Sequence, residues 1–126
     1  MQLLVNIDVD DLARAEAFYT IAFGLSVGRR FGSGGVELLG SGAPIYLLVK
    51  PADDRRHYDR HWTPVHLDFV VDDLVAARDR CVAAGATLEA DIVAHAWGSI
   101  ALFGDPFGHG FCLLRFTDAG YDAVAT

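Results

Sequence analysis

Apolar residues recur along two stretches of the chain with the spacing of one helix face. The first stretch holds Leu12, Ala15, Tyr19 and Ala22, and the second holds Leu74, Ala77, Cys81 and Ala84. Residues at i, i+3, i+7 and i+10 lie on one side of an α-helix. The pattern therefore predicts two helices that each bury this stripe.

Each predicted helix has a start signal and a stop signal. Aspartate pairs precede the two apolar stripes, as Asp10 and Asp11 in the first half and Asp72 and Asp73 in the second. A short acidic side chain accepts hydrogen bonds from the free amides at a helix start. Gly24 and Gly85 follow the last apolar positions and are typical of helix ends.

The two helical stretches belong to an internal repeat. Val5–Leu12 matches Leu67–Leu74 in pattern at an offset of 62, the distance from Asp11 to Asp73. Three strand-like runs separated by turn residues then follow each helix. These runs are Ser26–Phe31, Val36–Leu39 and Pro44–Lys50 in the first half, and Thr87–Val93, Trp97–Phe103 and Gly110–Phe116 in the second. Each half therefore predicts a βαβββ module, and the fold class is α+β.

We expect a single domain over residues 1–126. Module 1 covers about residues 2–50, module 2 covers 65–116, and a tail covers 117–126. Residues 51–64 are the most charged stretch of the chain and form the predicted linker. Two interpretations of this linker stay open, a lid or dimer contact through Tyr58 and Trp62, and a solvated connection.

Composition narrows the functional classes. With 126 residues, 52% hydrophobic and 21% charged, the chain can bury a substantial core. The formal net charge of −7 argues against a nucleic-acid partner. Apolar runs fall short of the roughly 20 residues that span a membrane, and the first residues do not match a secretory signal. We expect a soluble cytoplasmic protein without a membrane partner, and we expect Cys81 and Cys112 to be buried free thiols.

The tandem βαβββ repeat resembles the vicinal oxygen chelate superfamily, which includes glyoxalase I, extradiol dioxygenases and fosfomycin- and bleomycin-resistance proteins. The matching segments are Val9–Leu12 with Phe18-Tyr19 and Gly24-Leu25, His66–Leu74, Gly85-Ala86 and Asp105–Cys112. The resemblance covers about Leu3 to Phe116, and its last segment looks most like the glyoxalase-like branch. It implies a curved mixed sheet with a central cleft that binds a small molecule, and a homodimer.

Strand alternation indicates which side chains face this cleft. Leu67, Phe69 and Val71 should pack beneath the second helix, which leaves His66 and Asp68 on the other face. The same argument applies to the first half and to the closing strands. The expected cleft residues are Leu4, Asn6, Asp8, Tyr46, Leu48, His66, Asp68, Trp97, Cys112 and Leu114.

The resemblance implies metal ligands of the His or Gln type near each opening strand's start, and Glu on each closing strand. Only His66 fits, because Leu4 holds the matching place in the first half and Cys112 stands where Glu is usual. A divalent site generally needs three or more hard ligands. We therefore expect no cofactor. A divalent metal at His66 is the alternative, as half of a soft site with Cys112 that Asp68 or Asp8 would complete.

The leading hypothesis is a glyoxalase/bleomycin-resistance-like protein that binds a small, partly apolar molecule without a complete metal site. The alternative is a metal-dependent lyase, isomerase or dioxygenase. In that case the catalytic residues would be His66, as ligand or general base, and Asp68, which would orient its imidazole. A regulatory or interaction module without a small ligand is the third hypothesis. The sequence leaves the ligand and the question of catalysis open.

Overall fold

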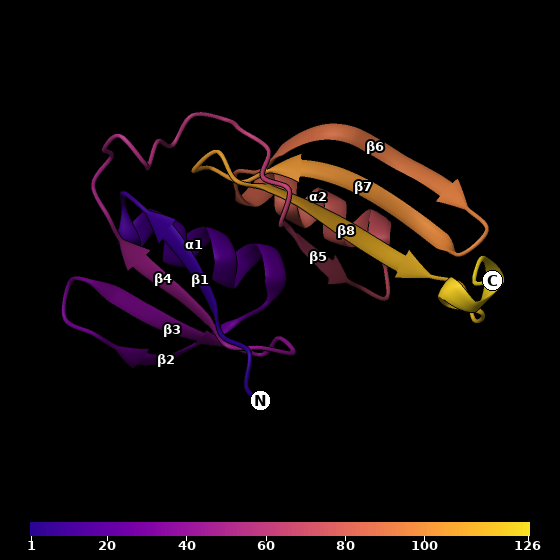
Figure 1. Cartoon of the computed structure of the whole chain (residues 1–126), viewed down its shortest axis with the longest axis horizontal. Helices are drawn as coiled ribbons and strands as arrows, with labels where there is room; N and C mark the ends of the chain where they lie inside the picture. The colour runs from indigo at the N-terminus through magenta and orange to yellow at the C-terminus, as the bar shows by residue number, and fades with distance from the viewer. The chain divides into compact units, whose positions relative to one another are not determined.

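The computed structural model describes all 126 residues, and the chain divides into two compact units, Met1–Asp59 and Arg60–Thr126. Each unit contains one α-helix and one four-stranded sheet (Figure 1). Each also follows the order β-α-β-β-β along the chain. The predicted α+β class and the tandem βαβββ arrangement are therefore confirmed.

The first unit contains a mixed sheet. Its elements are β1 (Val5–Val9), α1 (Leu12–Phe23), β2 (Ser26–Arg30), β3 (Gly35–Leu39) and β4 (Ile45–Val49). The strands lie in the order β1-β4-β3-β2, with β1 parallel to β4 and the other neighbours antiparallel. The parallel pair follows from the helical crossover between β1 and the later strands.

The second unit repeats this topology. Its elements are β5 (Leu67–Val70), α2 (Leu74–Ala84), β6 (Thr87–His95), β7 (Gly98–Gly104) and β8 (Gly110–Phe116). The strand order is β5-β8-β7-β6, and β5 runs parallel to β8. Opening and closing strands are therefore neighbours in both sheets.

The helices begin and end where the sequence predicts. The Asp11 and Asp73 carboxylates each accept a hydrogen bond from the backbone amide three residues later. The donors are Arg14 N and Ala76 N, both at 3.0 Å. Gly24 adopts φ +66° at the end of α1, a left-handed conformation that glycine enters without strain. No helix is both long enough and apolar enough to cross a membrane.

The predicted helix stripes are the buried faces. Ala15, Tyr19 and Ala22 of α1 are buried, as are Leu74, Ala77 and Cys81 of α2. Phe18 is buried next to Tyr19, so the buried face of α1 is wider than the stripe. Both cysteines are free and buried, as expected.

The tail contains a short 3-10 helix, Gly120–Ala123. It lies against the aromatic end of the second sheet, where the Tyr121 ring centroid is 4.7 Å from that of Phe116 and 5.5 Å from that of Trp97. The Thr117 amide also donates to the Trp97 carbonyl, at 3.0 Å. The first residues of the tail are therefore attached to the second unit by ring contacts and a main-chain hydrogen bond.

Candidate functional site

The face of the second sheet opposite α2 brings three coordinating side chains together. His66 lies immediately before β5, Asp68 is on β5, and Cys112 is on β8. Asp68 and Cys112 are partners in the parallel register of these strands, so both side chains point to the same face. The fold thus joins residues that are more than forty positions apart in the sequence.

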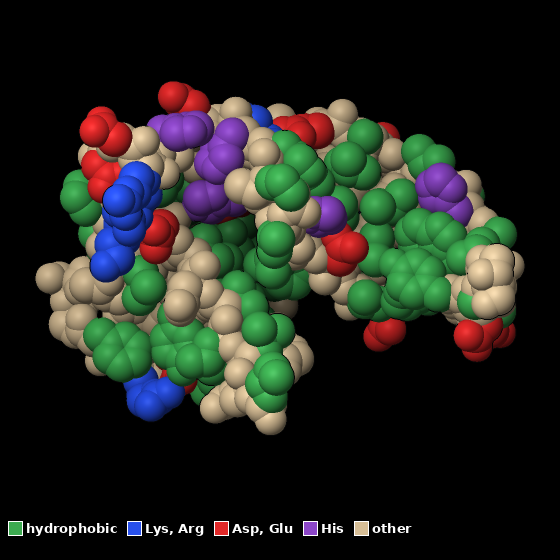
Figure 2. All heavy atoms as spheres, viewed as in Figure 1, with side chains coloured by type: hydrophobic (Ala, Val, Ile, Leu, Met, Phe, Trp, Pro, Cys, Tyr) green, Lys and Arg blue, Asp and Glu red, His purple; other side chains and the backbone are tan.

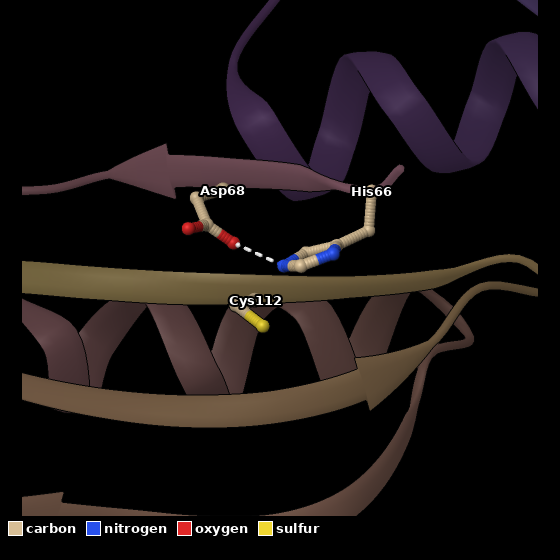
Figure 3. Close-up of side chains that lie close together, drawn as sticks. All are labelled: His66, Asp68 and Cys112. Carbon is tan, nitrogen blue, oxygen red and sulfur yellow. Dashed lines mark ion pairs between the residues drawn. The ribbon is translucent and has the colours of Figure 1, made fainter. Parts of the chain in front are cut away.

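The three side chains are within contact distance. Nε2 of His66 lies 3.3 Å from Oδ1 of Asp68 (Figure 3), and one donor atom of each residue lies within 4.8 Å of the other two. The Cys112 residue is only 3% exposed, whereas the His66 and Asp68 side chains are 30% and 38% exposed. Because of this difference in exposure, the thiol forms the floor of the cluster and the two polar side chains reach solvent. Figure 2 shows histidine side chains at the surface, some of them next to acidic ones.

Burial keeps the Cys112 thiol protonated. Loss of hydration raises the pKa of this thiol to about 12, and the negative charge and hydrogen bond of Asp68 add to the rise. Burial likewise raises the pKa of Cys81 to about 11. Because the thiolate is the nucleophile, neither cysteine is suited to nucleophilic catalysis near neutral pH.

Trp62 forms one side of the cluster. Its ring centroid lies 4.5 Å from that of His66, with the two planes tilted by 42°. The ring also rests on Gly110, where an added Cβ would overlap Trp62 ring atoms. The glycine allows the indole to lie directly on β8.

The Arg60 side chain packs on Gly104 of β7, beside the place where Trp62 rests on β8. A Cβ added at Gly104 would lie 2.8 Å from Cδ of Arg60, and Gly104 pairs with Gly110 in the antiparallel register. The Arg60 guanidinium forms an ion pair with Glu89 and lies 5.6 Å from the centre of the Trp62 ring. Two residues at the end of the predicted linker, Arg60 and Trp62, therefore contact the second sheet while staying partly exposed.

These contacts were missed by the sequence analysis, which placed Trp62 only in a linker. Two signals were present, a glycine within one predicted strand and a glycine just after another, since such residues often mark close approach of other groups. Tyr58, the other aromatic residue of the linker, donates a hydrogen bond to the Lys50 carbonyl, at 2.7 Å, within the first unit. The proposed roles of Tyr58 and Trp62 as a lid or dimer contact stay a prediction.

The remaining predicted residues of the second unit lie in two places. Leu114 is on β8 two positions after Cys112 and therefore shares its face, where it is 2% exposed. Trp97 lies between β6 and β7 at the other end of the sheet, stacked on His95 with ring centroids 5.3 Å apart. Gly98, next to Trp97, pairs with Phe116, about 13 Å along β8 from Cys112 at strand spacing. Trp97 is thus not part of the His66 cluster.

The residues predicted from the first half lie on the first sheet. Asn6 pairs with Tyr46 and Asp8 with Leu48 in the register of β1 and β4, so each pair shares a face. Leu4 precedes β1 and is 47% exposed. The Asp8 carboxylate lies 2.7 Å from Nε of Arg56, an ion pair that the sequence analysis did not anticipate.

A second unanticipated group surrounds Glu37 on β3, which is 5% exposed. Its carboxylate accepts hydrogen bonds from the Arg29 guanidinium, the Arg29 amide and the Tyr46 hydroxyl. These hydrogen bonds, those from Arg29 foremost, lower the pKa of Glu37 to about 2. The sequence does contain a signal for this group, because Glu37 lies within the apolar run Val36–Leu39. A charge that is buried with such a run needs a partner.

These features define an α+β protein of paired βαβββ modules with a His/Asp/Cys cluster on one sheet. A sequence model of the Glyoxalase-like domain family matches residues 4–114. The chain therefore belongs to this family, within the vicinal oxygen chelate superfamily. No curated protein matches the sequence.

Solved structures of this superfamily share the fold at low sequence identity. A glyoxalase/bleomycin resistance protein/dioxygenase family enzyme from Burkholderia phytofirmans is 20% identical, with a TM-score of 0.74 over 90% of this chain and 97% of that chain. A variant of the fosfomycin resistance protein FosX from Listeria monocytogenes, complexed with Mn(II) and a dihydroxypropylphosphonic acid, is 20% identical, with a TM-score of 0.75 over 94% and 91%. Lactoylglutathione lyase from Agrobacterium tumefaciens is 20% identical, with a TM-score of 0.66 over 91% and 92%.

The donor set on the second sheet does not fit a hard divalent cation such as Mn(II). Such ions prefer several oxygen and nitrogen ligands, but the cluster supplies two of these, from His66 and Asp68, and a buried thiol. The carboxylates of the first sheet are engaged elsewhere, since Arg29 binds Glu37 and Arg56 binds Asp8.

Proposed function

We propose that this chain is a glyoxalase-like binding protein for a small, partly apolar molecule, without a complete set of hard metal ligands. The observation that carries this proposal is the convergence of Trp62, His66 and Asp68 over a floor that includes Cys112 and Leu114. An aromatic wall, an apolar floor and a few polar groups are typical of small-molecule sites.

The chemistry of the side chains indicates what such a ligand offers. The Trp62 and His66 rings favour a flat, apolar part, because aromatic surfaces stack with little loss of conformational freedom. The Asp68 carboxylate accepts hydrogen bonds and favours a hydroxyl or an N–H group on the ligand. A ring compound with one polar edge satisfies both requirements.

The test is a thermal-shift screen of planar antibiotics and metabolites, followed by affinity measurements on variants. His66→Gln keeps a hydrogen-bonding side chain, so we expect it to change the binding free energy by about 1 kcal/mol, the net value of one hydrogen bond. His57→Gln, at an exposed position of the first unit, is the matched control and should leave binding unchanged. If His66→Gln and His66→Ala both leave the affinity of a confirmed ligand unchanged, this face is not the binding site.

A second candidate function is catalysis by the His66–Asp68 pair, as in a lyase or isomerase. Asp68 lies 3.3 Å from Nε2 of His66, an arrangement in which the carboxylate orients the imidazole and Nδ1 is left to accept a proton. For an enzyme, His66→Ala should lower turnover by about 10²-fold or more, the usual scale for a lost acid–base group. Turnover that survives this substitution would exclude the pair as the catalytic base.

We also propose that the chain forms a homodimer, because the proteins it resembles commonly build their clefts from paired subunits or paired modules. The cytoplasmic location expected from the sequence stays a prediction.

A further inference from the structure

A pocket of the second unit contains a positive and a negative side chain that form no ion pair within the chain. The β6–β7 hairpin extends past the start of α2 (Figure 1), and residues of both line this pocket of about 370 Å³. Its lining includes Asp72, Asp73, Val75, Ile92, Ser99 and Arg115. Sites for small molecules have volumes of about 300–1,000 Å³, so the pocket has the size for a small metabolite.

The pocket lies on the other face of the sheet from His66. Leu114 shares the face of Cys112, so Arg115, the next residue of β8, points to the face that α2 covers. Ser99 of β7 is the register partner of Arg115 and points the same way. A ligand in this pocket would therefore not touch the His66 cluster, and the inference does not depend on the proposed function.

The Arg115 side chain is anchored in a way that leaves a binding edge open. Its Nε donates to the Asp72 carbonyl, at 2.8 Å, whereas Nη1 and Nη2 form no hydrogen bond or ion pair within the chain. These two nitrogens form an edge of the guanidinium that can bind both oxygens of a carboxylate at once. The Ser99 hydroxyl, which has no hydrogen bond within the chain, is a further donor on the neighbouring strand.

The acidic side chains of the pocket argue against a simple anion as the ligand. The Asp72 carboxylate forms no ion pair and accepts no hydrogen bond, and the Asp73 carboxylate caps α2 without a cationic partner. An anion bound to Arg115 would lie near these two negative charges, and a simple cation would be repelled by the guanidinium. A molecule that carries both charges avoids both penalties.

We propose that this pocket binds a small zwitterion, an α-amino acid with an apolar side chain. Arg115 and Ser99 bind its carboxylate, and Asp72 binds its ammonium group. Val75 and Ile92 supply apolar surface for its side chain. Each part of the ligand thus meets a group of matching chemistry that the chain leaves without a partner.

The experiment is an NMR titration of the ¹⁵N-labelled full-length chain with L-leucine, L-valine, L-methionine and L-phenylalanine. At least one of these amino acids should shift the amide signals of Val75, Ser99 and Arg115 in a saturable way. The signals of Asp68 and Cys112, on the other face of the sheet, should stay in place. If no amino acid shifts the first group, or if the shifts fall on Asp68 and Cys112 instead, the proposal is wrong.

Two analogues of the tightest-binding amino acid separate the two charges. For leucine these are 4-methylpentanoate, which lacks the ammonium group, and 3-methylbutylamine, which lacks the carboxylate. Each should bind more than about tenfold more weakly than the amino acid, the scale of one lost hydrogen bond between charged groups. An analogue that binds as tightly as the amino acid would show a site for a simple anion or a simple cation and would overturn the assignment.

Variants assign the two charged ends of the ligand. Arg115→Lys keeps the positive charge but loses the paired N–H edge, and Asp72→Asn removes the negative charge at nearly constant size. Each should lower the affinity for the amino acid more than about tenfold. Arg55→Lys and Asp54→Asn, at exposed positions of the first unit, are the matched controls and should leave it unchanged.

The analogue without the ammonium group also distinguishes contact from a structural effect. Asp72→Asn should not weaken the binding of this analogue, because it has no group for Asp72 to bind. Asp72 and Arg115 are exposed, so both variants should fold. Full affinity for the amino acid in either variant, or an equal loss for the amino acid and the analogue in Asp72→Asn, would contradict the proposed contacts.

Discussion

The two sheets have the same topology, but the acidic residues predicted or found on their strands have different partners. On the first sheet the Glu37 and Asp8 carboxylates are bound by Arg29 and Arg56. On the second sheet Oδ1 of Asp68 lies 3.3 Å from Nε2 of His66, and Cys112 lies next to both. Arginines neutralise these acids of the first sheet, as Arg60 and Arg78 do for Glu89 and Asp91 on β6 of the second. Asp68 differs because it lies among groups that can exchange protons or bind metals.

The difference follows from the chemistry of the partners. Arginine stays charged at all ordinary pH values and offers several N–H donors, so it satisfies a carboxylate permanently. Histidine changes charge near neutral pH, and neutral histidine and deprotonated cysteine bind metals. Identical folds can therefore hold a structural ion pair in one module and a candidate functional site in the other. Three experiments test further differences between the two modules, in the helix core, the buried acid and the packing on the closing strand.

The largest expected effect concerns the helix positions at the 62-residue offset, Tyr19 and Cys81. Tyr19 is 3% exposed with its ring centroid 5.0 Å from that of Phe18, so Tyr19→Ala should lower the free energy of unfolding by about 3–5 kcal/mol. Cys81→Ala removes one buried sulfur and should cost about 1 kcal/mol. Urea denaturation measures both. If Tyr19→Ala lowers the free energy of unfolding less than Cys81→Ala does, the Phe18 ring, and not that of Tyr19, supplies most of the aromatic packing of the first unit.

An effect of intermediate size is expected at Glu37. Its pKa is lowered to about 2 in the folded chain, and an unfolded glutamate titrates near pH 4.3. A lowered pKa adds stability that is complete above the unfolded value and is lost as the pH falls toward the folded value. The stability difference between the wild type and Glu37→Gln should therefore be constant above about pH 5 and shrink between about pH 4.3 and 2.

The measurement is a series of urea denaturation curves at several pH values. Asp118→Asn, at an exposed residue of the tail, is the control and should show no such pH-dependent difference. A Glu37→Gln difference that stays constant down to pH 2 would mean that Arg29 does not hold this carboxylate in its charged form.

The smallest expected effect is at Gly110. An added Cβ would overlap the Trp62 ring, so Gly110→Ala should push the indole away from β8 into solvent. In a Trp97→Phe background Trp62 is the only tryptophan, and its emission should shift to longer wavelength. Gly42→Ala, where a Cβ meets nothing within 4 Å, is the matched control. Unchanged emission in the Gly110 variant would contradict the packing of Trp62.

Local patterns predicted the elements well because they depend on nearby residues. The apolar stripes and the caps Asp11 and Asp73 identify α1 and α2 directly, and the repeat links the two modules. Strand alternation placed Asp68 and Cys112 on the face opposite α2, and the parallel pairing of β5 with β8 brings them into register. The functional roles of these residues stay a prediction.

The sequence could not show contacts that depend on how distant segments meet. Arg29 and Glu37 come together through the pairing of β2 with β3, which contains a register shift that no local pattern indicates. Trp62 reaches His66 because the chain turns back onto β8 before β5 begins. Side-chain types alone predicted a charged linker there, with a lid or dimer contact and a solvated connection as the two interpretations.

The paired glycines Gly104 and Gly110 also decide where the chain can be divided. Arg60 and Trp62 pack directly on these two glycines, so these two residues belong to the folded body of that half. A fragment that starts at Val65 would expose the bare main chain of two adjacent strands to water and would leave Glu89 without its arginine. Separate expression of the halves should therefore cut between Asp59 and Arg60.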